Sequence, residues 1–100
     1  MNDYSNSALG VNSQSITSSR VTIASNVGRV TEDETPCRGV LLVAATGNSG
    51  VVRVRVGSAC TAATGIPVLS TGYLSIPIDD VSELYFYGTD GDVVDVLYRN

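Results

Sequence analysis

The chain contains no histidine, no lysine and no tryptophan among its 100 residues. Histidine is the commonest general base and the commonest metal ligand, so its absence removes the usual catalytic and zinc chemistry. A serine nucleophile without histidine needs a lysine or another unusual base, and lysine is missing too. The two cysteines, Cys37 and Cys60, have no histidine partner. The sequence therefore indicates neither a thiol protease nor a metal centre, and we expect no cofactor.

Positive charge is also scarce. The six basic residues are all arginines, and the net charge is −4. Nucleic-acid binding needs clustered Lys or Arg to neutralise phosphates, so we expect no nucleic-acid partner. No apolar run approaches the roughly 20 residues that span a bilayer, and the first residues lack the basic start and apolar core of a signal peptide. We therefore expect no membrane partner and synthesis in a cytoplasm, where both cysteines stay reduced and buried.

Acidic pairs are the remaining candidates for chemistry: Asp79–Asp80, Asp90–Asp92 and the run 32–34. Glycosidases need two carboxylates that face each other across a cleft, and nothing in the sequence marks a cleft. Asp90 and Asp92 offer oxygens to Ca²⁺, but the dense ligand run and terminal glutamate of a calcium loop are missing. A turn explains the same residues, and we expect a protein that is not an enzyme.

β-Branched and small polar residues dominate what is present. There are fifteen valines against one phenylalanine and one methionine, and Ser and Thr together make 21 residues. Valine loses rotamer freedom on a helix and packs well on a pleated sheet. With 43% hydrophobic residues, the chain has enough apolar surface for one small core. This composition predicts an all-β fold.

Short apolar runs separated by turn residues predict about eight antiparallel strands and no helix. They lie at residues 19–24, 28–31, 37–45, 51–57, 66–70, 73–78, 83–88 and 92–99. This spacing is typical of a β-sandwich, which we expect to be jelly-roll-like. Residues 1–18 are mostly Ser, Asn and small residues without a period. We assign them to a flexible N-terminal arm and residues 19–100 to one sandwich domain.

Individual strands carry more specific predictions. Residues 37–45 are almost wholly apolar, which predicts burial on both faces. In residues 51–57, Val52, Val54 and Val56 alternate with two arginines, so the arginines should lie on the opposite face. Residues 73–78 contain a proline, which predicts an edge strand or an exit from the ladder. The Asp-Gly pair between 83–88 and 92–99 predicts that these two strands form a hairpin.

The aromatic residues gather near that Asp-Gly pair. Leu84 and Phe86 should point into the core, so that Tyr85 and Tyr87 lie half-exposed on the outside, with Tyr98 of the paired strand beside them. Such a stripe can be cross-strand packing, a protein interface or a weak platform for a sugar. These three interpretations stay open from the residues alone.

Residues 36–98 contain an ordered series of motifs: a Pro-Cys-Arg opening, an Asn-Ser-Gly turn before a valine-rich strand, a TG-x-P segment, an Asp-Asp stretch and a Tyr-x-x-Gly strand before a final Val-x-Val-Leu-Tyr. The order of these motifs resembles a small β-sandwich domain of structural proteins in tailed bacteriophages. The residues that fall on this pattern are Pro36, Cys37, Arg38, Asn48, Gly50, Gly57, Gly65, Asp79, Asp80, Leu84, Tyr85, Gly88, Leu97 and Tyr98.

The resemblance implies a virion structural protein, most like a capsid cement or decoration protein on the outer surface of the phage head. Such a protein binds the major capsid protein and bridges neighbouring subunits. The alternative is a receptor- or glycan-binding module of a head fibre or tail. A small sandwich gains valency from symmetry, so we expect a homo-oligomer, either a dimer or a trimer. The predicted contact residues are Arg53, Arg55, Tyr85, Tyr87, Tyr4 and Arg20.

Overall fold

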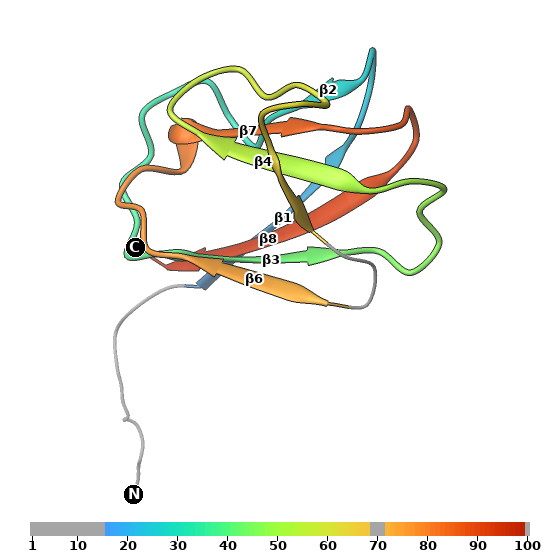
Figure 1. Ribbon diagram of the computed structural model, residues 1–100. Coiled ribbons are helices and arrows are strands. Elements are labelled where there is room, and N and C mark those ends of the chain that lie inside the picture. Colours follow the sequence, from blue (N-terminus) through green and yellow to red (C-terminus); the bar gives the residue numbers. More distant parts are fainter. Residues whose placement is uncertain (1–15, 69–71, 100) are drawn as a thin grey trace, which may run out of the picture.

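The computed structural model describes residues 16–68 and 72–99, which form eight strands and one short 3-10 turn (Figure 1). The strands are β1 Ile16–Thr22, β2 Val27–Gly28, β3 Val40–Ala44, β4 Val52–Val56, β5 Ile66–Val68, β6 Tyr73–Ile76, β7 Leu84–Tyr87 and β8 Val93–Arg99. The 3-10 turn, Val81–Glu83, leads into β7. It is the one described segment that departs from the expectation of no helix.

The strands form two four-stranded antiparallel sheets. Sheet A has the order β1-β8-β3-β6 and sheet B the order β2-β7-β4-β5. Strands that follow one another in the chain occupy the same position in the two sheets: β1 lies across from β2, β8 from β7, β3 from β4 and β6 from β5. The chain therefore passes from one sheet to the other at every connection except the one between β4 and β5. The predicted β-sandwich is confirmed; the jelly-roll-like winding stays a prediction, with which these orders agree.

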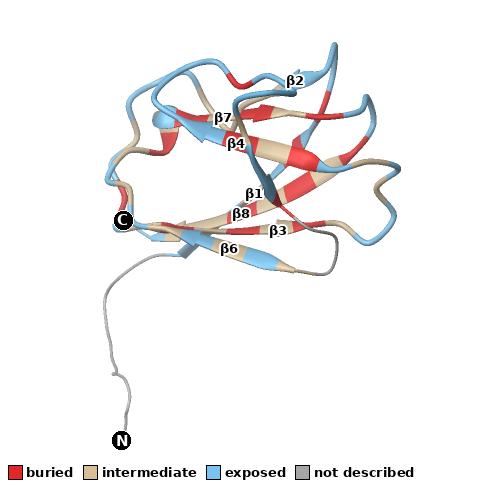
Figure 2. Ribbon diagram, in the orientation of Figure 1, coloured by how far each residue is buried: buried red, intermediate tan, exposed pale blue. Residues whose placement is uncertain are grey.

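The core lies between the two sheets and is built from alternate residues of nearly every strand (Figure 2). Its largest fully buried side chains are Phe86, Ile23, Leu42, Leu84, Val52, Val54, Val68, Val81, Val94 and Val96. Valine dominates because its short branched side chain fills the narrow space between two close sheets. Leu84 and Phe86 point inward as predicted, and both are at most 1% exposed.

The predicted hairpin at the Asp-Gly pair is wrong. β7 pairs with β2 and β4, whereas β8 pairs with β1 and β3, so the turn carries the chain from sheet B to sheet A. Gly91 has φ 91, as a tight turn requires, and its N–H donates to the Ile23 carbonyl 2.9 Å away. Tyr98 therefore lies in sheet A and packs against the core, not beside the other two tyrosines.

Two further predictions need correction. β3 is buried on one face only: Val40, Leu42 and Ala44 are buried, while Leu41 and Val43 are half-buried on the outer face of sheet A. The predicted arm ends too late: residues 16–18, the last three of the predicted arm, form the start of β1, which begins at Ile16. Residues 1–15 lie outside the described residues.

The prediction from the proline in residues 73–78 is confirmed, because β6 ends at Ile76 before Pro77 and is an edge strand.

Truncation of Phe86 tests the weight of this core. We expect Phe86→Ala to lower the free energy of unfolding by about 3–5 kcal/mol, because it removes the largest buried side chain and leaves a cavity. The matched control is Tyr73→Ala, because Tyr73 is 77% exposed and its truncation should change stability by at most about 0.5 kcal/mol. Urea unfolding followed by circular dichroism gives both values. Equal losses for the two variants would contradict this assignment of the core.

Candidate functional site

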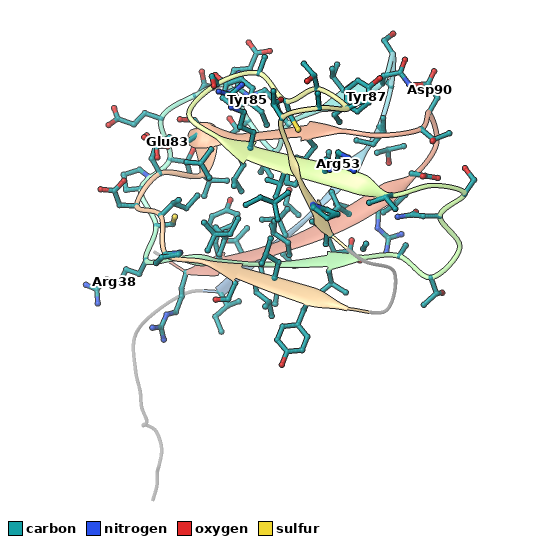
Figure 3. The ribbon with its side chains drawn as sticks, in the orientation of Figure 1. Arg38, Arg53, Glu83, Tyr85, Tyr87 and Asp90 are labelled. Carbon is teal, nitrogen blue, oxygen red and sulfur yellow. The ribbon has the colours of Figure 1, made fainter. Side chains whose placement is uncertain are left out.

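Four of the six predicted contact residues lie together on the outer face of sheet B. β4 and β7 are neighbours whose register pairs Arg53 with Tyr87 and Arg55 with Tyr85. The intervening residues of both strands point into the core, so alternation sends these four side chains outward. Figure 3 shows Tyr85, Tyr87 and Arg53 on this side of the molecule. We call these four residues, together with Arg29, the Arg/Tyr face.

Arg29 joins the face from the end of β2. Its guanidinium carbon lies 4.0 Å above the centroid of the Tyr85 ring, a cation–π contact. The Nη2 atom of Arg29 also donates to the carbonyl oxygen of Ser82, which anchors the guanidinium to the 3-10 turn. Arg29 is not among the predicted contact residues, since β2 has two residues and gives no period. The placement of Tyr85 on an outward face was the available signal that a neighbouring cation would stack there.

The loop between β4 and β5, residues 57–65, covers part of the same face. Nη1 of Arg53 donates to the Gly65 carbonyl at 2.9 Å, and Nη1 of Arg55 donates to the Ala59 carbonyl at 3.3 Å. A side chain at Gly65 would collide with Cys60 Sγ and Arg53 Cβ, so the loop packs tightly onto the strand. The half-buried Arg53 and the exposed Arg55 therefore both hold this loop.

A hollow of about 550 Å³ opens beside the stacked pair. It is lined by residues 27–32, by Ala59 and Cys60 of the covering loop, and by Tyr85 and Phe86. Its wall carries a guanidinium, the Glu32 carboxylate and an aromatic ring next to apolar side chains. Such a lining suits a partner's side chain or the ring of a small polar ligand.

The other two predicted contact residues are not part of this face. Arg20 lies on β1 in sheet A, where its Nε atom is 2.9 Å from Asp95 Oδ1 in an exposed ion pair. The hydrogen bond to Asp95 raises the pKa of Arg20. Tyr4 lies outside the described residues.

The carboxylates of the Asp-Gly turn hold loops together. Asp92 is 4% exposed, and its Oδ1 accepts hydrogen bonds from Ser49 N at 2.8 Å and Ser49 Oγ at 3.1 Å. Its Oδ2 accepts from Gly50 N at 2.9 Å. These donors, the Ser49 amide above all, lower the pKa of Asp92. Asp90 Oδ1 accepts from Asn26 N at 2.7 Å, so both aspartates clamp turns that are distant in sequence.

Asp80 has a similar role at the opposite end of the sandwich. Its Oδ1 accepts from Thr35 N at 3.0 Å, Ser82 N at 2.9 Å and Ser82 Oγ at 2.7 Å. The Thr35 amide contributes most to lowering the pKa of Asp80. Asp80 thereby caps the 3-10 turn and ties it to the segment before β3.

Among residues 16–68 and 72–99, no cluster of three or more His, Cys, Asp or Glu side chains is placed to hold a metal ion. In the same part of the chain no helix is long and apolar enough to cross a membrane. Cys37 and Cys60 are buried and free, as predicted, and burial raises the pKa of both thiols.

Comparison with known protein families, with curated proteins and with solved structures finds no match for this chain. The Arg/Tyr face and its hollow are therefore the features from which a function has to be argued.

The loop-clamping role of Asp92 gives a prediction on pH. The folded-state pKa of Asp92 lies below its unfolded value of about 3.9. The Asp92 carboxylate therefore stabilises the fold fully above that pH, and its contribution to the free energy of unfolding shrinks as pH falls through the folded-state pKa. Asp92→Asn replaces an acceptor oxygen by an amide donor that faces backbone donors, so we expect lower stability at pH 7. The stability difference from the wild type should narrow between pH 5 and pH 2, roughly the range in which carboxylates titrate.

Thermal unfolding across that pH range measures the difference directly. Asp33→Asn is the matched control, because Asp33 is an exposed carboxylate in the loop before β3. That control should stay close to the wild type at every pH. A stability difference for Asp92→Asn that is the same at pH 7 and pH 2 would show that the carboxylate charge does not hold the loop.

Proposed function

We propose that this protein is a capsid cement protein of a tailed bacteriophage. In this proposal it is synthesised in the host cytoplasm, binds the outer surface of the head and bridges neighbouring subunits of the major capsid protein. The motif order over residues 36–98 supports the phage assignment by resemblance. The Arg/Tyr face supplies the surface that such a role needs, and it is the observation that carries the proposal.

The chemistry of the Arg/Tyr face suits a protein partner. Tyrosine and arginine are enriched in protein interfaces, because each combines a large contact area with polar groups that find partners. Here Tyr85 and Tyr87 are half-buried, and their strand is fixed by β2 on one side and β4 on the other. The backbone of paired strands is already ordered, and hydrogen bonds already hold the guanidinium groups of Arg29 and Arg53, so the face is partly preorganised for contact.

The charge of the face indicates what the partner offers. Arg29, Arg53 and Arg55 bring three of the six arginines of an acidic chain to one side of sheet B. Guanidinium groups bind carboxylates and backbone carbonyls, so we propose that the capsid surface presents acidic side chains or exposed loop carbonyls at the binding position. Repetition over a symmetric shell turns modest single contacts into high avidity.

Co-sedimentation with phage heads from which the protein has been removed tests the proposal. We expect binding that saturates at a stoichiometry set by the shell's local symmetry axes, with restored resistance of the heads to heat. Absence of binding, or only a few copies per head, would overturn the cement role.

Reversal of one charge tests whether the Arg/Tyr face makes the contact. We expect Arg55→Glu to weaken head binding at least about tenfold, or 1.4 kcal/mol, because Arg55 is exposed on that face. Arg38→Glu is the matched control: Arg38 is also exposed but lies far from the face, as Figure 3 shows. Arg53→Ala is less suitable: Arg53 is half-buried and its 2.9 Å bond to Gly65 is shorter than the 3.3 Å bond of Arg55 to Ala59, so its loss should loosen loop 57–65 more. Equal effects of Arg55→Glu and Arg38→Glu would remove this face from the proposal.

The hollow next to Tyr85 favours one second candidate, a glycan-binding module of a head fibre or tail. An aromatic ring beside polar groups in a hollow of about 550 Å³ is an arrangement that holds a sugar ring. This candidate predicts that the isolated protein binds host cell-surface polysaccharide and does not bind stripped heads. Titration of both partners against one preparation separates the two functions.

A further inference from the structure

Within the part of the chain that the structure describes, strand β1 is an unprotected sheet edge. A sandwich of two four-stranded sheets has four edge strands, which here are β1, β6, β2 and β5. Edge strands expose unpaired backbone groups, and proteins usually block them with proline, short length or charge. β5 contains Pro67, β6 has four residues followed by Pro77, and β2 has two residues. β1 has seven residues, contains neither proline nor glycine, and its single charge, Arg20, is already paired with Asp95.

The register of β1 identifies the backbone groups that stay free. Ile23 N donates to the Asp92 carbonyl at 2.9 Å, so Ile23 directs its backbone groups toward the β8 side. Bonding direction alternates along an antiparallel strand, and therefore Val21, Ser19 and Thr17 also bond to β8. The N–H and C=O groups of Ile16, Ser18, Arg20 and Thr22 then point to the open edge. Among the described residues, no strand pairs with that edge.

We propose that β1 pairs antiparallel with β1 of a second copy of this chain and joins the two A sheets into one eight-stranded sheet. The register places Ser19 opposite Ser19 of the second copy, around a twofold axis. Ser18 then lies opposite Arg20 of the second copy, and Ile16 lies opposite Thr22. This interface does not depend on the proposed capsid role.

The charge pattern of β1 is compatible with a second copy in this register, because its one charged residue, Arg20, lies opposite Ser18 and not opposite Arg20 of the second copy. All seven residues are paired, and the residues with outward backbone groups face one another. A shift by two residues in one direction would bring Arg20 opposite Arg20 and place like charges together, which destabilises a strand pair. The opposite shift places Arg20 opposite Ile16 and leaves Thr22 without a partner within Ile16–Thr22.

The expected affinity follows from the size of the contact. Two seven-residue strands meet over about 23 Å, so the contact buries less than the roughly 1,200 Å² of a stable interface. The dimer should therefore be weak in dilute solution, with a Kd in the micromolar range or above, and should form at high local concentration. Symmetric two-strand pairing of this kind closes on itself, so it predicts a dimer and not an open filament.

Disulfide capture tests the proposed register. Residues directly opposite at a position without backbone bonds have Cα atoms about 4.5 Å apart, which suits a disulfide. Ser19→Cys at about 0.5 mM, above the expected Kd, should therefore give a covalent dimer on mild oxidation. The controls are Ser75→Cys on the edge strand β6 and the wild type, whose two cysteines are buried. Both should stay monomeric on a non-reducing gel; equal cross-linking of Ser19→Cys and Ser75→Cys would overturn the proposal.

Sedimentation velocity tests the edge without a new thiol. Ser18→Pro removes an outward N–H and no bond to β8, so the fold should persist while dimerisation is lost. Ser75→Pro is the matched control, because Ser75 lies on the other edge of sheet A and its backbone groups also point outward. A wild-type protein that stays monomeric up to about 1 mM would overturn the proposal. If Ser18→Pro instead reduces only head binding, the occupant of the edge is a capsid strand and the second copy is excluded. Both measurements use purified protein alone, so their failure is distinct from failure of the capsid proposal.

Discussion

Packing of small branched side chains between two four-stranded sheets is the interaction on which the rest of this structure depends. A sandwich core is one layer of interdigitated side chains thick, so each strand must give alternate residues to it. In β4 these are Val52 and Val54, and in β7 they are Leu84 and Phe86. Successive side chains of a strand point to opposite faces, so the neighbours of these core residues must point outward. The Arg/Tyr face is thus a direct consequence of which residues of β4 and β7 fill the core.

The same parity explains which parts of the structure could be predicted from the sequence. A period of two is a local signal, and it correctly placed Arg53 and Arg55 on the face opposite the valines of β4. It also placed Phe86 in the core and Tyr85 outside. Strand partners are not local: the Asp-Gly turn has the residues of a hairpin turn, yet β7 and β8 lie in different sheets. In the folded protein β7 pairs with β4 and β8 pairs with β3. These two pairings, and the core that they build, outweigh the hairpin pairing of β7 with β8 that the turn would allow.

Sequence distance also explains what was missed at the candidate site. Arg29 reaches the Ser82 carbonyl across 53 residues, and β2 is too short to show a period. The bond from Arg53 to Gly65 depends on how loop 57–65 folds back over its own strand. Likewise, Asp92 is an acidic turn residue in the sequence, and the amides of Ser49 and Gly50, 43 and 42 positions away, make it a clamp. Three carboxylates of the acidic pairs, those of Asp80, Asp90 and Asp92, accept hydrogen bonds from backbone donors of turns.

A protein that bridges other subunits needs at least two contact regions that do not compete. Here the Arg/Tyr face lies on the outside of sheet B, and the unprotected edge lies at the end of sheet A. Pairing along β1 would leave the Arg/Tyr face of both copies open, so a dimer would present two such faces related by a twofold axis. Two linked weak contacts bind far more tightly than one when their spacing matches the target. The weakness of a seven-residue strand pair is then an advantage, because dimerisation would occur mainly where a surface has already concentrated the protein.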